Sequence, residues 1–166
     1  VDRASDFIIR NKDKPFYLHV FPNDVHDKHV ATEEKLAKYE NYEKDPFLQA
    51  ILSVHDNMDD QIGRLLDALD EHEITDNTIV IFTSDNGPTD WPRYYKEGFA
   101  PPGYTGPFFG RKWCLYEGGI RMPFIIRWPA KVEAGKTDGT SIVAALDLFE
   151  GRSKNQTIQK PSHGAL

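Results

Sequence analysis

The pattern of apolar and polar positions predicts one long helix with one strand before it and one strand after it. Residues 15–21 are aromatic and β-branched and follow a polar turn, which is typical of a buried strand. From Pro46 to Glu71 apolar side chains recur at spacings of three and four, with Asp45 as the N-cap. Residues 78–83 form a second apolar run. This order predicts a right-handed crossover that pairs the two strands in parallel.

Weaker patterns predict the remaining segments. Residues 32–42 contain helix formers but few apolar positions, which favours a short surface helix. Residues 120–128 predict a third strand, and its Pro123 belongs at a strand start or an edge. Residues 140–149 predict a short helix, whereas the tail 150–166 is polar and lacks periodicity.

Composition and charge narrow the class of protein. The 166 residues are 39% hydrophobic and 12% aromatic, which indicates a folded chain, and no apolar run is long enough for a membrane helix. Acidic residues outnumber basic ones, 26 to 20, which argues against nucleic acid as a partner. A single cysteine, Cys114, excludes an internal disulfide and a Cys-based zinc site. Because the chain begins at Val1 and its first residues look like the approach to a strand, we expect a fragment or a processed chain.

The second apolar run ends in a group of oxygen-bearing side chains. Asp85 and Asn86 supply a carboxylate and an amide oxygen, and Gly87 permits a sharp turn after them. Such oxygens suit Ca²⁺ or Mg²⁺. The alternative is an ordinary turn, which Asp, Asn and Gly form readily.

Two further residues are candidates for contact with an anion. Lys112 lies in the glycine-rich stretch 110–119, where a cation could meet an oxyanion away from water; the alternative is a surface lysine beside Arg111. His26 follows the first predicted strand and could be a general acid, a metal ligand or a plain loop residue. Parallel pairing of the strands would bring His26 and Asp85 to one edge of the sheet.

The long stretch 87–110 is rich in proline, glycine and aromatic residues. A loop of this length in a compact domain is usually functional or disordered, and its aromatic content favours function. Three aspartates at 56, 59 and 60 lie within the predicted long helix and are interpreted as its solvated face rather than a calcium loop. Cys114 is interpreted as a packing residue.

The ordered set of motifs resembles the sulfatase family, whose fold is similar to that of alkaline phosphatase. The resemblance rests on residues 16–18 followed by His26, on residues 79–88 with Thr-Ser-Asp-Asn-Gly, on residues 110–123 with Glu-Gly-Gly-Ile-Arg-Met-Pro, and on residues 127–129. It implies an α/β fold, an alkaline-phosphatase-like sandwich with a mainly parallel or mixed central sheet flanked by helices. Residues 1–149 would be the middle to C-terminal portion of the catalytic domain, with 150–166 as a polar tail.

The resemblance also implies roles for individual residues. Asp85 and Asn86 would form half of a metal site, for Ca²⁺ rather than Mg²⁺, while Lys112 and His26 would contact the sulfate as catalytic and substrate-binding residues. The family's formylglycine nucleophile comes from a Cys/Ser-x-Pro-x-Arg segment, but Cys114 is followed by Leu-Tyr-Glu. The nucleophile and the first pair of metal aspartates are therefore expected outside this chain, which alone would be catalytically incomplete.

The implied function is hydrolysis of a sulfate ester. Aromatic side chains of the loop between Trp91 and Phe109 would suit the face of a sugar, so a sulfated carbohydrate is the expected substrate class. The alternatives are a phosphoester hydrolase or transferase of the same superfamily, and a non-catalytic fragment or glycan-binding module. A periplasmic, secreted or lysosomal location is expected from the family.

Overall fold

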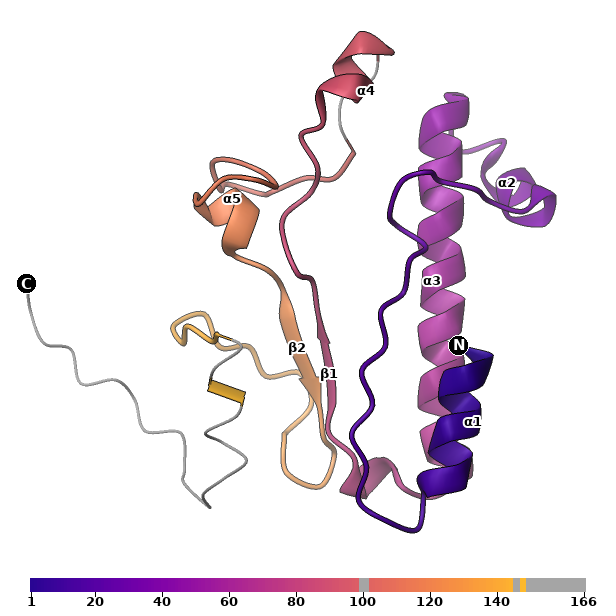
Figure 1. Ribbon diagram of the computed structural model, residues 1–166, viewed down its shortest axis with the longest axis vertical. Coiled ribbons are helices and arrows are strands. Elements are labelled where there is room, and N and C mark those ends of the chain that lie inside the picture. The colour runs from indigo at the N-terminus through magenta and orange to yellow at the C-terminus, as the bar shows by residue number, and fades with distance from the viewer. Residues whose placement is uncertain (99–101, 145–146, 149–166) are drawn as a thin grey trace, which may run out of the picture. The chain divides into compact units, whose positions relative to one another are not determined.

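The computed structural model describes residues 1–98, 102–144 and 147–148, and it divides into one unit of residues 1–132 and another of residues 133–166. The first unit contains the elements of Figure 1: α1 (Asp2–Asn11), α2 (Glu33–Tyr39), α3 (Pro46–Glu71), the 3-10 helix η1 (Thr75–Asn77), β1 (Val80–Thr83), α4 (Pro92–Lys96), α5 (Glu117–Ile120) and β2 (Phe124–Arg127). No described helix is both long and apolar enough to cross a membrane.

The long helix α3 is the framework of the first unit, and its predicted bounds are confirmed. The Asp45 carboxylate accepts a hydrogen bond from the Phe47 backbone N–H at 2.9 Å, which caps the N-terminus of the helix as predicted. Its buried residues include Val54 and Leu69, and both α1 and α2 pack against it (Figure 1).

The predicted surface helix is α2, and ion pairs fasten it to α3. Thr32 caps α2 by accepting a hydrogen bond from the Lys35 backbone N–H. The Asp56 carboxylate of α3 accepts hydrogen bonds from the ammonium groups of Lys35 at 2.7 Å and Lys38 at 2.6 Å. The Asp56 side chain is only 13% exposed, so it joins two helices rather than belonging to a solvated face.

The prediction for the start of the chain is wrong, because residues 2–11 form helix α1 rather than the approach to a strand. The amphipathic pattern of this short segment buries Ile8 on the side that packs against α3. The ring of Phe7 also lies 6.0 Å from the ring of Phe16, which joins α1 to the segment that follows it.

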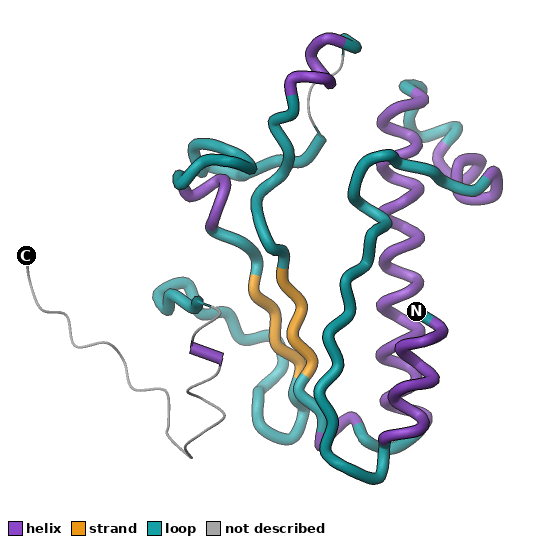
Figure 2. The backbone as a smooth tube through the Cα atoms, viewed as in Figure 1, coloured by secondary structure: helices purple, strands orange, loops and turns teal. Residues whose placement is uncertain are grey.

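The predicted strand at residues 15–21 is also wrong, and with it the parallel pairing. These residues alternate as in a strand, with Phe16, Leu18 and Val20 half-buried and Tyr17 and His19 exposed. A strand also needs a hydrogen-bonded partner, and none of the described segments provides one, so Figure 2 shows them as loop.

The sheet in the described residues consists of β1 and β2, which pair antiparallel, with Val80 opposite Arg127 and Thr83 opposite Phe124. Pro123 directly precedes β2, which confirms its predicted place at a strand start. The prediction of a buried strand is wrong for β1: Ile81 and Phe82 are each 39% exposed. A strand face becomes buried only under a second layer, and no described element covers this pair.

The predicted helix at residues 140–149 has no counterpart in residues 140–144, whereas residues 147–148 are helical and the rest of the span lies outside the described residues. The Asp138 carboxylate accepts hydrogen bonds from the backbone N–H groups of Thr140 at 2.8 Å and Ser141 at 3.0 Å, which holds an irregular turn there. The predicted polar tail, 150–166, lies outside the described residues.

Candidate active site

The two predicted metal ligands follow β1 directly. The Ser84 hydroxyl donates to the Asn86 carbonyl at 3.0 Å, and the Asn86 amide donates to the Gly87 carbonyl at 2.9 Å. This use of the amide nitrogen leaves the Asn86 side-chain oxygen available. The Asp85 carboxylate is exposed and accepts no hydrogen bond within the described part of the chain. Two adjacent side-chain oxygens are therefore available to a cation.

Backbone hydrogen bonds join this strand-end loop, residues 84–88, to the stretch that contains Lys112. The Gly87 N–H donates to the Gly119 carbonyl at 2.9 Å, and the Lys112 N–H donates to the Pro88 carbonyl at 2.9 Å. The stretch 110–119, called here the lysine loop, is therefore held directly against the loop that contains Asp85 and Asn86. The two bonds join residues that are 32 and 24 positions apart in the sequence.

The close packing of these two loops explains their glycines. A Cβ atom on Gly87 would lie 1.9 Å from the Gly118 carbonyl oxygen, and one on Gly118 would lie 2.0 Å from the Gly110 carbonyl oxygen. Gly118 and Gly119 are both buried. A side chain at Gly87 would push the two loops apart, and one at Gly118 would collide with the backbone at the start of its own loop, so close backbone approach requires glycine at both positions.

Arg111 anchors the long loop that follows the strand-end loop. Its guanidinium donates to the carbonyl of Thr89 at 2.8 Å and to those of Pro102 at 2.6 Å and Gly103 at 3.0 Å. The sequence analysis assigned no role to Arg111 beyond its place next to Lys112. Arg111 instead fixes the path of the loop next to the lysine loop, a role that its position in the sequence did not indicate.

Lys112 lies in a four-residue turn from Arg111 to Cys114, closed by a hydrogen bond from the Cys114 N–H to the Arg111 carbonyl at 3.3 Å. Its side chain is half-buried and forms no ion pair with a carboxylate of the described residues. Its ammonium nitrogen lies 5.9 Å from the centre of the Trp113 ring. The Lys112 charge is therefore available to an anion. The Cys114 thiol donates to the Arg111 carbonyl at 2.9 Å, which agrees with a packing role.

His26 lies in the loop before α2 and is exposed. Its Nδ1 is 3.0 Å from the Asp27 carbonyl oxygen. No hydrogen bond or ion pair connects it to Asp85, Asn86 or Lys112 across the described segments. The structure thus brings the predicted metal ligands and Lys112 together, whereas His26 belongs to a separate loop.

An aromatic cluster connects the His26 loop to the long loop indirectly. The Phe47 ring, in the first turn of α3, lies 6.1 Å from the His29 ring and 5.5 Å from the Tyr94 ring in α4. Tyr94 is 1% exposed, so part of the predicted aromatic loop packs internally. Other aromatic side chains of this region remain exposed, namely those of Trp91, Tyr95, Tyr104 and Phe109.

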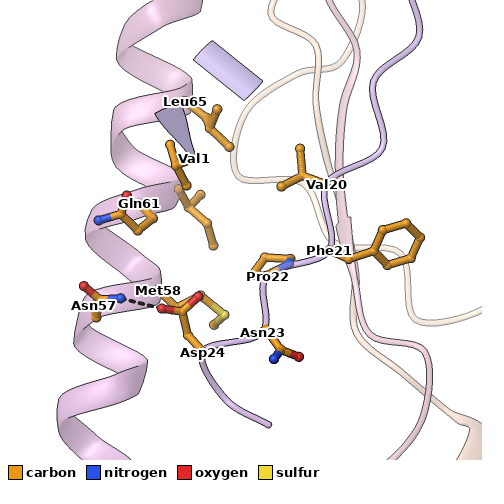
Figure 3. Close-up of a pocket in the computed structure, with 11 residues that line it drawn as sticks. Val1, Val20, Phe21, Pro22, Asn23, Asp24, Asn57, Met58, Gln61 and Leu65 are labelled. Atoms are coloured by element: carbon orange, nitrogen blue, oxygen red, sulfur yellow. Dashed lines mark hydrogen bonds between the residues drawn. The ribbon is translucent and has the colours of Figure 1, made fainter. Parts of the chain in front are cut away.

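A cavity of about 340 Å³ lies between α3 and residues 20–24 (Figure 3). Met58, Ile62 and Leu65 of α3 line one side of it, and Asn57 donates a hydrogen bond to Asp24 at its edge. None of the four predicted site residues lines this cavity. Its walls combine apolar side chains with those of Asn23, Asp24, Asn57 and Gln61, and no lysine or arginine of the described residues lines it, so it offers no cationic side chain to an anion.

The donor set at residues 85–86 fits a hard cation but does not complete its coordination. Ca²⁺ takes about six to eight oxygen ligands, and in the described residues no group of three or more His, Cys, Asp or Glu side chains gathers around a possible metal position. Asp85 and Asn86 can provide one side of a coordination shell. The remaining ligands must come from water, substrate or other parts of the protein.

The chain is similar in sequence to known sulfatases. A family model described as Sulfatase matches residues 1–151. The chain is 37% identical over 152 residues to an N-acetylgalactosamine-6-O-sulfatase of Bacteroides thetaiotaomicron, a match that covers 89% of this chain and 28% of that protein.

Solved structures agree with the sequence match. PsFucS1 sulfatase from Pseudoalteromonas sp. superposes with a TM-score of 0.63 at 32% identity, over 81% of this chain and 25% of that chain. Ps i-CgsB in complex with k-i-k-neocarrahexaose gives 0.61 at 29% identity, over 81% and 28%. These neighbours confirm part of an alkaline-phosphatase-like α/β fold. The chain spans less than a third of each of these relatives.

Proposed function

The chain belongs to the sulfatase family, and from this premise we propose that the full-length protein carrying it hydrolyses a sulfate ester. One observation supports this proposal most directly. Hydrogen bonds from Gly87 to Gly119 and from Lys112 to Pro88 join the loop that contains Asp85 and Asn86 to the loop that contains Lys112. A sulfate monoester needs such an arrangement, because its non-bridging oxygens are anionic while its leaving oxygen gains charge as the S–O bond breaks.

Each candidate residue has a distinct task in this proposal. The Lys112 ammonium donates hydrogen bonds to the sulfate oxygens and offsets their charge. Asp85 and Asn86 would hold a calcium ion through their side-chain oxygens. When bound, such an ion would supply Lewis-acid stabilisation of negative charge on the sulfate. His26 donates a hydrogen bond to the sulfate or a proton to the bridging oxygen, once the full-length protein brings its loop to the site.

The nucleophile of the proposed reaction is the formylglycine of the family, located in a part of the protein outside this chain. Because the other metal ligands are proposed to lie there too, this chain contributes one wall of the active site. In this proposal the chain holds Lys112 close to Asp85 and Asn86, and the close packing of its glycines and the backbone hydrogen bonds between the two loops support that role.

The proposed substrate is a sulfated carbohydrate. Two relatives support this class through their names, since one is an N-acetylgalactosamine-6-O-sulfatase and the other was solved with a neocarrahexaose. Exposed aromatic rings of the long stretch 87–110, among them Trp91 and Tyr95, offer flat apolar faces to a sugar.

The test is a comparison of 4-nitrophenyl sulfate with 4-nitrophenyl phosphate as substrates of the full-length protein. We expect hydrolysis of the sulfate, and a preference for the phosphate would instead support a phosphoester hydrolase of the same superfamily.

Lys112→Ala should lower turnover by about 10²–10³-fold, as removal of one oxyanion donor does, without a change in melting temperature. Lys131→Ala, an exposed lysine after β2, is the matched control and should keep wild-type turnover. Unchanged turnover of Lys112→Ala would refute its contact with the sulfate.

A further inference from the structure

Trp113 has a backbone conformation that favours glycine. Its φ is +74°, in the left-handed region, and it occupies the third position of the turn from Arg111 to Cys114. Turns with a positive φ at this position usually have Gly or Asn there, because a Cβ atom crowds the backbone. The large indole side chain is therefore held at this position at a cost in conformational free energy.

Packing within the described chain does not account for the indole. Trp113 is 66% exposed. Tyr94, another aromatic residue of the same region, is 1% exposed and packs against Phe47. A strained backbone and an exposed ring together indicate that the contribution of Trp113 comes from a contact outside the described residues.

The turn gives the indole a fixed position beside Lys112. Lys112 and Trp113 are the two central residues of the turn. The Lys112 ammonium nitrogen lies 5.9 Å from the centre of the Trp113 ring. The Lys112 N–H donates to the Pro88 carbonyl, and the Arg111 N–H donates to the Cys114 sulfur at 3.3 Å. The ring and the cation are thus presented together by a turn that is tied to the strand-end loop. A cation–π contact at such an exposed position is weak and does not by itself explain the ring.

We propose that Trp113 is a substrate-binding residue, whose indole face packs against the sugar ring that bears the sulfate bound by Lys112. This inference rests on the proposed function. A sulfate next to the Lys112 ammonium places the attached ring within reach of the adjacent side chain. Sugar rings present a face of C–H groups that packs well on an aromatic plane. Lys112 then recognises the anion and Trp113 recognises the group that carries it.

The test separates these two kinds of recognition in the full-length protein. Hydrolysis of 4-nitrophenyl sulfate is the assay, with inorganic sulfate and N-acetylgalactosamine 6-sulfate as competitive ligands. In Trp113→Gly the inhibition constant of the sulfated sugar should rise about tenfold, as loss of one aromatic contact predicts, while that of inorganic sulfate changes less than about twofold. Trp113→Phe should retain most of the affinity for the sugar. Leu115→Ala, two residues away and 90% exposed, should change neither constant.

Glycine is substituted for Trp113 because it removes the indole without disturbing the backbone at this position. Because glycine adopts a positive φ without strain, Trp113→Gly should melt at or above the wild-type temperature. A lower melting temperature without a selective loss of sugar affinity would show that another part of the protein covers the indole, which overturns the inference. An equal rise of both inhibition constants would show that Trp113 only positions Lys112, and would overturn it as well. Absence of 4-nitrophenyl sulfate hydrolysis by the wild type would instead refute the proposed function, and the inference with it.

Discussion

Single residues set the spacing of the candidate site. Gly87 has no side chain between its backbone and the Gly118 carbonyl, and this allows the strand-end loop to contact the lysine loop. Arg111 acts in the opposite way, with a long side chain that reaches three carbonyl groups of the long loop before it. The positions of Asp85 and Lys112 thus depend on neighbours that have no chemical role of their own.

Gly87 and Gly63 allow a direct test of this close approach. Gly87→Ala should destabilise the protein by about 1–3 kcal/mol, as overpacking typically does, and should lower sulfatase turnover because it separates Asp85 from Lys112. Gly63→Ala, at a position in α3 with no atom within 4 Å of the added Cβ, should stabilise it by roughly 0.5–1 kcal/mol. Urea denaturation and turnover of both variants would test this. Equal free energies of unfolding for Gly87→Ala and Gly63→Ala would contradict the role given to Gly87.

Sequence reasoning identified residues at this scale only where their chemical type was informative. Asp85, Asn86 and Lys112 are groups that bind ions, and their placement after a strand or in a glycine-rich loop was visible in the sequence. Arg111 and Trp113 were not selected, because their roles depend on the carbonyls within reach and on a positive φ. The carbonyl groups near Arg111 and the φ angle of Trp113 are properties of the folded backbone, and a sequence pattern does not show them.

At the scale of elements, the contact between α2 and α3 depends on charge. The ammonium groups of Lys35 and Lys38 hold the pKa of the Asp56 carboxyl below its ordinary value of 3.8. The paired carboxylate in turn raises the pKa of the Lys35 ammonium. Beneath this pair, Ser53 is fully buried and its hydroxyl lies 3.0 Å from the Lys35 carbonyl. A polar arrangement therefore fixes α2 where apolar contacts are few.

This arrangement predicts a specific dependence of stability on pH. A carboxyl group with a lowered pKa in the folded state stabilises the fold above its unfolded pKa, and this stabilisation is lost as the pH falls through the folded pKa. Below about pH 5, the free energy of unfolding should thus decrease more steeply with falling pH in the wild type than in Asp56→Asn. Asp67→Asn, an exposed aspartate of the same helix, should follow the wild-type curve. Urea midpoints across this range would test it, and parallel curves for Asp56→Asn and wild type would contradict it.

The elements differ in how far local sequence determines them. The bounds of α3 were predictable because cap, proline and apolar period all agree over 26 residues. Residues 15–21 have the composition of a strand, but a strand exists only with a partner. The antiparallel pairing of β1 with β2 was missed because residues 84–123 intervene, and no local pattern shows that they turn the chain back.

At the scale of the whole molecule, the exposed apolar side chains of the first unit point to a larger domain. Ile81 and Phe82 on β1 and Ile125 and Ile126 on β2 are each 39% exposed or more. A sheet of two strands is marginal by itself, and apolar strand faces are normally covered by a further layer. This agrees with relatives that are more than three times as long as their match to this chain. The family fold could be predicted from motifs, but the burial of its sheet could not be judged from this segment.

The contact between Gly87 and Gly118 has an energetic consequence for the two proposed ligands. Since neither loop can shift without the other, binding of calcium at Asp85 and Asn86 and binding of sulfate at Lys112 should be thermodynamically linked, and linkage is reciprocal. Calorimetry on the full-length protein should show inorganic sulfate binding more tightly with calcium present than after chelation, and calcium binding more tightly by the same factor with sulfate present. In Gly87→Ala this factor should fall towards one. Independent binding of the two ions in the wild type would mean that the loops, although in contact, transmit no free energy between their ligands.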